Sequence, residues 1–433
     1  MALNPIPFTR EVTEQFRRYQ LTAFPIADPN LAAQARALLG AGAFRASPLA
    51  KGPYVSLARA FLPGAALADL AAEGAIHPAL ATVAEYPSLF AHQEKTLRAV
   101  LAGKHVLIST GTGSGKTESF LYPIVDHCLR LRDDKAPAGV AAILVYPMNA
   151  LAADQRDRLR TLLAGTGITY GMWTGATPET PARADVRRLP EGSDRAALLA
   201  ARKRKRRNDA DPVPWEECVS ESEIRERHPR ILITNSNQLE LLLTRPRDFE
   251  LFGDALRFIV LDEAHTYSGA TGAEVACLVR RLRAFAGKDP GEVTCIATSA
   301  TITDPESAPE LAPAFLSRLC GVPESDVELI AEEYEPLAWP GKRSIPAEPA
   351  DPEGLLARVL AALGSAHGDD EDEEAGVDVD ALAGCVEELT GDRPSLPSGG
   401  VAETLYEHLA AQEPVRVLAE ELEHPRDLAW VTQ

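Results

Sequence analysis

The sequence lacks the cysteine patterns that metal centres and redox sites use. Its 433 residues include six cysteines but no Cys-x-x-Cys pair, and no histidine stands at a metal-binding spacing from them. Structural zinc sites and dithiol redox sites depend on such spacings. We therefore expect reduced, mostly buried thiols, as in a cytoplasmic protein.

No segment of the sequence resembles a secretion signal or a membrane span. Arg10, Glu11 and Glu14 interrupt the N-terminal region where a secretion signal needs an unbroken apolar core. One uncharged run, residues 136–153, contains Pro137 and Pro147, so a strand followed by a turn fits it better than a span. The sequence thus predicts a cytoplasmic protein with no membrane partner.

An excess of basic residues is missing as well. The formal net charge is −19, which argues against a protein built chiefly as a basic coat for nucleic acid. The acidic charge is concentrated in residues 351–433, which hold 20 acidic and 4 basic residues. The rest of the chain is close to neutral, so it can still form a local basic groove. Within the acidic part, the run Asp369–Glu374 is typical of a flexible loop.

From residue 105 onward, short β-rich runs alternate with amphipathic helices, the pattern of a parallel α/β sheet. The predicted strands cover residues 105–109, 141–146, 169–173, 231–234, 258–261 and 294–298. We expect three regions along the chain. A helical N-terminal region covers residues 1–84, an α/β domain covers 85–303, and an acidic, mostly helical extension covers 304–433.

A polar, proline-containing stretch at residues 176–230 interrupts the α/β domain and reads as an insertion. It should contain one helix over Ser193–Arg206, with Ser193 as its N-cap. The basic block Arg202–Arg207 lies at the end of this helix. A solvated helix face explains the block best, with contact to duplex phosphates or a localisation signal as alternatives.

Residues 110–117 read Thr-Gly-Thr-Gly-Ser-Gly-Lys-Thr and join a predicted strand to an amphipathic helix, which is the setting of a phosphate-binding loop. Glycines let backbone N–H groups turn towards phosphate oxygens, and the helix N-terminus adds its dipole. Lys116 would contact the β and γ phosphates, and the Thr117 hydroxyl would ligate Mg²⁺. Thr110 stands where the strict pattern has glycine. The residues expected to hold ATP are Thr112, Gly113, Ser114, Gly115, Lys116 and Thr117.

A second motif follows the strand predicted at residues 258–261, where the chain reads Asp-Glu-Ala-His. Carboxylates at a strand end beside a phosphate-binding loop suit the hydrolysis of Mg·ATP. Asp262 would hold Mg²⁺, partly through water, and Glu263 would orient and deprotonate the attacking water. The catalytic residues predicted from these two motifs are Lys116, Asp262 and Glu263.

These motifs together resemble the first RecA-like domain of the superfamily 2 DEAD/DEAH-box helicases. Further motifs in the same order carry the resemblance, which covers about residues 85–303. Phe90-Ala91-His92-Gln93 is similar to the upstream glutamine motif, which implies that Gln93 reads adenine. Ser299-Ala300-Thr301 is similar to the family's Ser-Ala-Thr motif, which implies that these residues and His265 couple hydrolysis to the grip on nucleic acid.

The resemblance also implies residues that touch a nucleic-acid backbone. Residues 146–151, Tyr-Pro-Met-Asn-Ala-Leu, are similar to the motif usually written Pro-Thr-x-Ala-Leu, and two later strand ends carry Thr-Gly and Thr-Asn. Simple turn and capping roles explain such residues equally well when each is taken alone. The expected nucleic-acid contacts are Asn149, Ala150, Thr174, Gly175, Thr234 and Asn235.

In more detail, the motifs are similar to large bacterial helicases of the MrfA/Hrq type and of the DISARM and Druantia anti-phage systems. A working helicase of this superfamily closes ATP between two RecA-like domains, and the second domain donates arginine fingers. We find no Gln-x-x-Gly-Arg-x-x-Arg run after Thr301. We therefore expect either the N-terminal piece of a longer protein or a subunit that needs a second lobe from a partner.

Three functional hypotheses follow from the sequence. The first is ATP-driven translocation on nucleic acid, or its unwinding, with DNA expected rather than RNA. The second is an RNA helicase, because the motifs imply a grip on backbone and no base-reading element. The third is a nucleotide-gated scaffold in a defence complex. The intact Glu263 favours hydrolysis, whereas the missing arginine finger favours the scaffold when the chain is alone.

Overall fold

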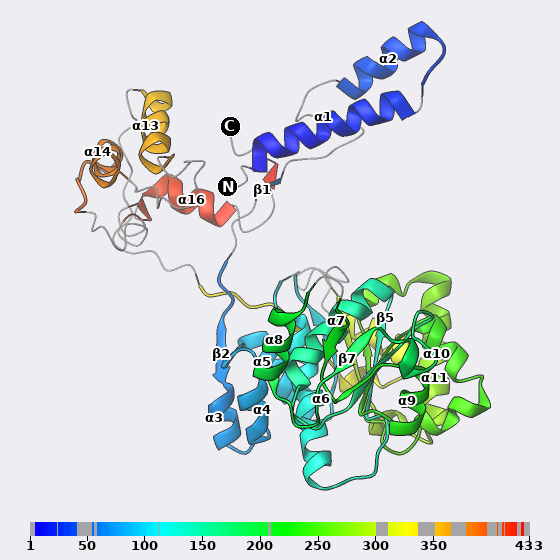
Figure 1. The fold of residues 1–433 in the computed structure, drawn as a ribbon. Coiled ribbons are helices and arrows are strands. Elements are labelled where there is room, and N and C mark those ends of the chain that lie inside the picture. Colours follow the sequence, from blue (N-terminus) through cyan, green and yellow to red (C-terminus); the bar gives the residue numbers. More distant parts are fainter. Residues whose placement is uncertain are drawn as a thin grey trace. The chain divides into compact units, whose positions relative to one another are not determined.

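The computed structural model describes residues 5–23, 25–40, 54–55, 59–111, 113–206, 209–299, 311–336, 351–364, 378–395, 405, 409–410, 412–421 and 426–427. The chain divides into two compact units (Figure 1). Unit 1 combines Met1–Arg59 with Pro336–Gln433, and unit 2 is Ala60–Glu335.

Unit 2 is built around one eight-stranded sheet in which every pairing is parallel. The strand order is β13-β4-β12-β11-β5-β10-β6-β9. The strands are β4 (His105–Ser109), β5 (Ala142–Tyr146), β6 (Tyr170–Trp173), β9 (Glu217–Cys218), β10 (Ile231–Asn235), β11 (Phe258–Leu261), β12 (Thr294–Ser299) and β13 (Val327–Ala331). The six strands predicted from sequence all belong to this sheet. The predicted RecA-like α/β fold is therefore confirmed.

Helices cover both faces of the sheet because successive strand residues point to opposite sides. In β5, Leu144 belongs to one buried cluster, whereas Ile143 and Val145 belong to the other. The first cluster lies under α5 (Ala91–Leu101), α6 (Lys116–Asp133) and α7 (Asn149–Leu163). The second lies under α10 (Ser236–Leu242), α11 (Gly269–Phe285) and α12 (Leu311–Cys320).

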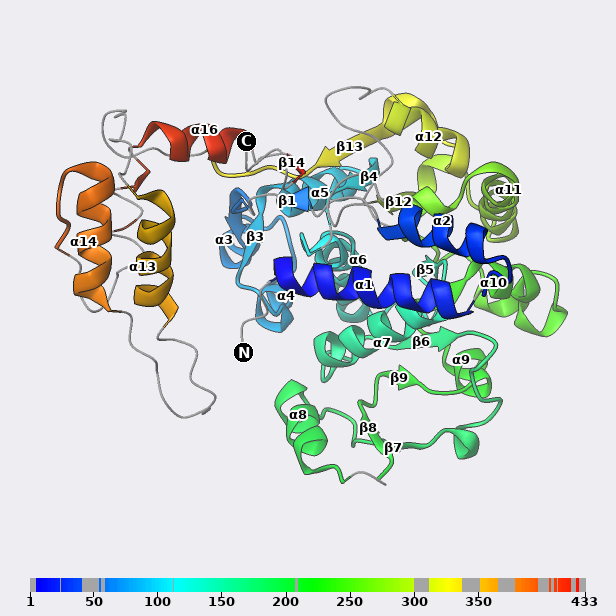
Figure 2. The ribbon, with the colours of Figure 1, turned by 90° about the horizontal axis from the view of Figure 1, so that it is seen from above.

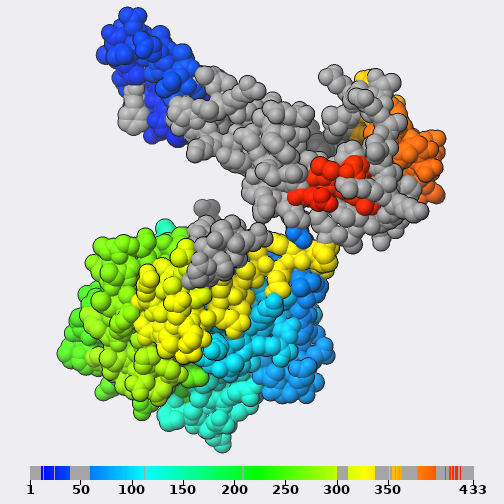
Figure 3. Space-filling view, turned by 180° about the vertical axis from the view of Figure 1, so that it is seen from behind, coloured from blue at the N-terminus to red at the C-terminus, as the bar shows by residue number. Residues whose placement is uncertain are grey.

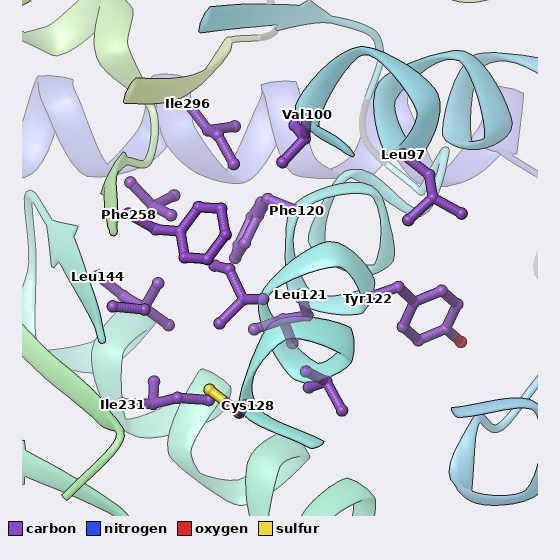
Figure 4. Close-up of a cluster of buried hydrophobic side chains, with 14 of the residues drawn as sticks. Leu97, Val100, Phe120, Leu121, Tyr122, Cys128, Leu144, Ile231, Phe258 and Ile296 are labelled. Atoms are coloured by element: carbon purple, nitrogen blue, oxygen red, sulfur yellow. The ribbon is translucent and has the colours of Figure 1, made fainter. Parts of the chain in front are cut away.

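Helix α6 follows the phosphate-binding loop and is anchored by the first of these clusters. Figure 4 shows Phe120, Leu121 and Cys128 of α6 facing strand residues such as Leu144 and Phe258. Burying one such large side chain contributes about 1.5–3 kcal/mol. The start of α6 is therefore held in place by packing further along the same helix.

Unit 2 extends beyond the predicted range 85–303 at both ends. On the N-terminal side, β2 (Pro63–Ala66) and β3 (Ser88–Phe90) pair antiparallel, and α3 (Leu67–Ala72) and α4 (Pro78–Val83) lie between them in sequence. Leu67, Leu70 and Leu80 join the first buried cluster. On the C-terminal side, β13 comes from residues that the sequence assigned to the acidic extension. Whether residues 85–303 form a domain on their own stays a prediction.

The expected insertion at residues 176–230 lies at the β6 edge of the sheet, where Figure 2 shows α8, β7, β8 and β9. Its elements are η1 (Pro181–Arg183), β7 (Val186–Arg188), α8 (Arg195–Arg204), β8 (Asp211–Val213), β9 and α9 (Glu221–Arg227). The helix predicted over Ser193–Arg206 is α8, but its N-cap is Asp194, whose carboxylate accepts the Ala197 N–H at 2.8 Å. In the basic block, Lys203, Arg204, Lys205 and Arg206 are exposed, and Arg207 lies outside the described residues.

Short 3-10 turns complete unit 2, namely η2 (Pro246–Leu251), η3 (Ala264–Thr266), η4 (Pro290–Glu292) and η5 (Glu324–Asp326). Unit 1 contains α1 (Pro5–Ala23), α2 (Pro29–Gly40), α13 (Pro352–Gly364), α14 (Val379–Thr390) and α16 (Glu413–Glu421). In unit 1, β1 (Tyr54–Val55) pairs antiparallel with β14 (Arg426–Asp427). The acidic run Asp369–Glu374 lies outside the described residues.

Two expectations about composition can be compared with the structure. All six cysteines are free thiols, and five of them are buried, Cys277 being the exposed one. Among the described residues, no helix is both long and apolar enough to cross a membrane.

Candidate nucleotide and nucleic-acid site

The predicted site residues meet at one edge of the sheet. Because β4, β12 and β11 are parallel neighbours, their carboxyl ends lie side by side. Lys116 opens α6 after β4, Asp262 follows β11, and Ser299 ends β12. Open α/β sheets bind ligands in the crevice outside the carboxyl ends of their strands.

The phosphate-binding loop depends on two glycines with left-handed backbone conformations. Gly113 has φ = 84° and Gly115 has φ = 76°. A Cβ atom at Gly115 would also collide with the Nε2 atom of Gln93. A larger residue at Gly115 would therefore be strained in its backbone and would displace the Gln93 amide from the loop.

Hydrogen bonds from side chains of the loop stabilise its backbone conformation. The Thr110 and Ser114 hydroxyl oxygens lie 2.7 Å apart, and Ser114 also donates to the Gly111 carbonyl at 2.9 Å. The Lys116 ammonium donates to the Thr110 carbonyl at 3.1 Å. Thr110, which departs from the strict loop pattern, thus contributes a hydroxyl that glycine lacks. Thr112 lies outside the described residues.

Two side chains at the start of α5 hold the loop from outside. His92 Nε2 donates to the Ser114 carbonyl at 2.9 Å, and Gln93 Nε2 donates to the Gly115 carbonyl at 3.0 Å. Gln93 Oε1 accepts the Phe90 N–H at 2.8 Å, which closes the first turn of α5. Burial lowers the pKa of His92. Gln93 is therefore tied to the loop, and its contact with adenine stays a prediction.

Thr298 in β12 connects the Asp262 carboxylate with the backbone of Glu263. The Glu263 N–H donates to the Thr298 hydroxyl oxygen at 3.1 Å, and that hydroxyl donates to the Asp262 carboxylate. Glu263 has φ = 49°, a conformation that non-glycine residues adopt at a cost of about 1–3 kcal/mol. The sequence reasoning did not find Thr298, although it directly precedes the Ser-Ala-Thr motif.

Lys116 and the two carboxylates place opposite charges at this edge. Burial raises the pKa of Asp262 and so does the neighbouring Glu263 carboxylate, whereas the hydrogen bond from Thr298 and the positive charge of Lys116 oppose that rise. No group of three or more His, Cys, Asp or Glu side chains in the described part of the chain could hold a metal ion. The Thr117 hydroxyl and the Asp262 carboxylate suit Mg²⁺, which usually takes one or two protein oxygens and completes its shell with phosphates and water.

The residues expected to couple hydrolysis to nucleic acid lie next to these carboxylates. His265 Nδ1 is 3.3 Å from Glu263 Oε2 and 3.5 Å from Ser299 Oγ. A path of polar contacts therefore connects the end of β11 with the end of β12. Ala300 and Thr301 lie outside the described residues.

The expected nucleic-acid residues divide into exposed and buried groups. Asn149, Ala150 and Gly175 are exposed, and Asn235 Nδ2 donates to Asn149 Oδ1 at 2.8 Å. The side chains of Thr174 and Thr234 are buried, and the Thr234 hydroxyl donates to the Trp173 carbonyl at 2.8 Å. The two threonines thus shape the strand ends, while Asn149 and Asn235 present polar groups at the surface.

The fold and this arrangement define a P-loop nucleotide-binding domain. Residues 90–200 and 215–308 match the model of the DEAD/DEAH box helicase family. The chain therefore carries the domain of a DEAD/DEAH-box ATP-dependent helicase of superfamily 2, which confirms the predicted resemblance.

Curated relatives agree with this family. The Druantia protein DruE of Escherichia coli (strain UMEA 4076-1) is 29% identical over 375 residues, which is 68% of this chain and 20% of that protein. The ATP-dependent helicase hrq1 of Schizosaccharomyces pombe is 26% identical over 52% of this chain and 18% of that protein. The ATP-dependent RNA helicase has1 of Aspergillus niger is 37% identical over 100 residues, 23% of this chain and 16% of that protein. The chain spans about a fifth of the length of each.

Solved structures include similar folds. The helicase MrfA bound to DNA is 23% identical with a TM-score of 0.43, covering 64% of this chain and 29% of MrfA. The DEAD-box helicase Mss116 bound to single-stranded RNA and UDP-BeF is 19% identical with a TM-score of 0.44, covering 64% of this chain and 47% of Mss116.

Proposed function

We propose that this chain is the ATP-hydrolysing part of a helicase or translocase that moves on nucleic acid. One observation carries the proposal. Thr298 bonds both Asp262 and Glu263 at the same sheet edge as the phosphate-binding loop. A nucleotide held by the loop would then face the Asp262 carboxylate, which Thr298 orients, and the side chain of Glu263, whose backbone Thr298 holds; hydrolysis of Mg·ATP uses two such carboxylates.

Each residue of this edge has a part in the proposed reaction. The Lys116 ammonium would leave the Thr110 carbonyl and contact the β and γ phosphates. Thr117 and Asp262 would hold Mg²⁺, which neutralises charge on the phosphate oxygens when bound. Glu263 would orient the attacking water and take its proton. Glu263 adopts a left-handed backbone conformation at the cost of local strain, and its carboxylate lies 3.3 Å from His265 Nδ1.

The nucleic acid would lie along the neighbouring strand ends. Asn149 and Asn235 already share a hydrogen bond there, and both carry amide groups that can donate to phosphate oxygens. Ala150 and Gly175 lie exposed on the same edge and let a backbone approach closely. Coupling would pass from Glu263 through His265 to Ser299, and onward to Ala300 and Thr301.

We propose DNA as the substrate, because the sequence motifs resemble those of repair and anti-phage helicases. The similarity to Druantia DruE over 68% of this chain supports a role in anti-phage defence. The local similarity to the RNA helicase has1 favours RNA as the second candidate. Since the exposed residues of this edge suit backbone contacts, the protein surface alone does not discriminate the two.

The proposed partner is a second RecA-like lobe, supplied by the same longer protein or by another subunit. This chain spans 20% of DruE, which leaves room for such a lobe in a protein of that size. Without the lobe, the chain would serve as a nucleotide-gated scaffold with little turnover of its own.

The test is ATPase activity of the 433-residue chain with single-stranded DNA, duplex DNA and single-stranded RNA of one sequence. Each is measured with and without a candidate second lobe, and Glu263→Gln is the control for contaminating ATPases. Stimulation by DNA that requires the second lobe supports the proposal. Stimulation by RNA alone would favour the RNA helicase, and nucleotide binding without turnover in every mixture would favour the scaffold.

A further inference from the structure

Two segments that are far apart in the sequence form a short ribbon near the nucleotide site. Residues 60–62 and 332–335 make up this ribbon. The Leu62 N–H donates to the Glu333 carbonyl at 2.8 Å, and the Glu335 N–H donates to the Ala60 carbonyl at 2.9 Å. Phe61 and Tyr334 form an antiparallel bridge between these bonds. Figure 3 shows the yellow surface of residues 311–336 beside the blue surface that begins at residue 59.

Aromatic side chains attach the ribbon to the start of α5. The Phe61 ring stacks on Tyr334 with centroids 5.2 Å apart, and it also packs against Phe90 at 5.1 Å and His92 at 5.5 Å. The Ala91 N–H donates to the Leu62 carbonyl at 2.8 Å. The ribbon is therefore fixed to the same turn of α5 that presents His92 and Gln93 to the phosphate-binding loop.

Glu332 and Glu333 point to different partners from adjacent positions. Glu333 pairs with Lys95 of α5 at 2.6 Å. Glu332 Oε2 instead accepts the backbone N–H of Gly111, within the phosphate-binding loop, at 2.7 Å. Glu332 directly follows β13, and β13 pairs with β4, the strand that leads into the loop. The contact thus joins the end of one strand to the loop that follows its neighbour.

We propose that Glu332 is a positioning residue of the nucleotide site, holding the first turn of the phosphate-binding loop through Gly111. This inference rests on the proposed nucleotide-binding function. His92 and Gln93 hold the far end of the loop, at Ser114 and Gly115, and Glu332 holds its near end.

Holding both ends matters because the loop contains three glycines, Gly111, Gly113 and Gly115, whose backbones are otherwise free to move. Ordering them when a ligand arrives would cost conformational entropy. A loop already ordered by contacts binds more tightly, since part of this cost is met on folding. For nucleotide affinity, we therefore expect the length of the Glu332 side chain, which lets its oxygen reach the Gly111 N–H, to matter more than its charge.

Four variants of the full chain separate reach from charge. Glu332→Gln keeps an acceptor of the same length and removes the charge. Glu332→Asp keeps the charge and shortens the reach, and Glu332→Ala removes both. Glu333→Ala is the matched control, because it removes the neighbouring carboxylate and leaves the Gly111 contact intact.

The first measurement is hydrogen–deuterium exchange of peptides that cover residues 107–117, without added nucleotide. We expect faster exchange in Glu332→Ala and Glu332→Asp, and exchange like the parent chain in Glu332→Gln and Glu333→Ala. Unchanged exchange in Glu332→Ala would overturn the proposal. Melting temperatures identify variants that fail to fold, and Glu332→Asp, the mildest change of reach, then decides the question.

The second measurement is the affinity for a fluorescent adenine nucleotide with Mg²⁺. Loss of the Gly111 contact should weaken binding about fivefold to tenfold in Glu332→Ala and Glu332→Asp. Glu332→Gln should bind like the parent chain, and Lys116→Ala defines the signal without specific binding. If the parent chain binds no nucleotide, the proposed function fails, while the exchange rates still decide whether Glu332 holds the loop. The positioning role would be contradicted if Glu332→Gln weakened nucleotide binding while Glu332→Asp bound like the parent chain.

Discussion

The hydroxyl of Thr298 donates a hydrogen bond to the carboxylate of Asp262. The same hydroxyl accepts the backbone N–H of Glu263 at 3.1 Å. One side chain on β12 thereby fixes the orientation of one carboxylate and the backbone of the next. Its position just before Ser299 places it between the residues proposed for hydrolysis and those proposed for coupling.

We predict that Thr298→Val lowers the maximal ATPase rate about tenfold, because both hydrogen bonds are lost while the side-chain volume is kept. Thr298→Ser should retain most of the rate, since it keeps the hydroxyl. The measurement is steady-state ATPase activity with the second lobe and nucleic acid present. Equal rates for Thr298→Val and the parent chain would show that Asp262 and Glu263 are oriented by other contacts.

Lys116→Ala should abolish nucleotide binding, whereas Glu263→Gln should retain binding and lose turnover. In the proposed reaction, Lys116 would supply the charge that attracts the phosphates, and Glu263 would act on the attacking water. The chain alone should hydrolyse ATP slowly, because an arginine finger contributes about 10³–10⁵ in rate in related phosphate-loop enzymes. Calorimetric titration and a coupled ATPase assay separate the two effects. Fast DNA-stimulated turnover by the isolated chain would contradict the need for a second lobe.

Asn149→Ala and Asn235→Ala should each weaken nucleic-acid binding by a similar factor for every sequence tested. Both residues lie at the strand ends and share a hydrogen bond, so they should act on the backbone rather than on bases. Leu241→Ala is a control, because Leu241 is an exposed apolar residue of α10. Fluorescence anisotropy with several single strands of equal length measures the effect. A loss confined to one sequence would point to base recognition.

The buried pair of Arg160 and Glu217 should be important for the stability of unit 2. Arg160 Nε donates to Glu217 Oε2 at 2.5 Å, and the two side chains are 5% and 3% exposed. Glu217→Ala would leave a buried guanidinium without its main partner, at a cost of about 3–5 kcal/mol. Asp157→Ala removes a 53% exposed partner of the same arginine and should cost about 0–1 kcal/mol. Urea unfolding compares the two variants, and similar losses would contradict this account.

Acidification should destabilise the protein through His92. Burial lowers the pKa of His92 in the folded chain, so the unfolded chain binds more protons below about pH 6.5, where an ordinary histidine titrates. The stability that His92 contributes is therefore present above that pH and is lost as the pH falls. Unfolding free energies of the parent chain and of His92→Gln, measured between pH 8 and pH 5, test this. The variant should show the smaller pH dependence.

The sequence predicted the central strands well because they are short apolar runs in a regular order. It did not predict β13, whose middle contains Glu328 and whose residues are mostly only partly buried. Inner strands of a parallel sheet are recognised as continuous apolar runs because both of their faces are buried, and an edge strand such as β13 lacks that run. The insertion was recognised as polar sequence, but its short strands and the Asp194 cap were not.

Candidate site residues within contiguous motifs could be named from the sequence, whereas contacts between distant segments could not. Lys116, Asp262 and Glu263 each belong to a recognisable local pattern. Thr298 stands 36 residues from Asp262, and Glu332 stands 221 residues from Gly111. No local periodicity encodes such pairs, because they arise only when parallel strands bring their ends together.

The chain enters unit 2 at Ala60 and leaves it at Glu335, and these two residues are joined by a hydrogen bond. Unit 2 is therefore inserted in sequence between the two segments of unit 1. Tyr54 of the first segment pairs with Asp427 of the second. During synthesis on the ribosome, unit 2 can complete its sheet before residues 336–433 of unit 1 have been made. The β1–β14 pair of unit 1 can therefore form only after the whole of unit 2 has been synthesised.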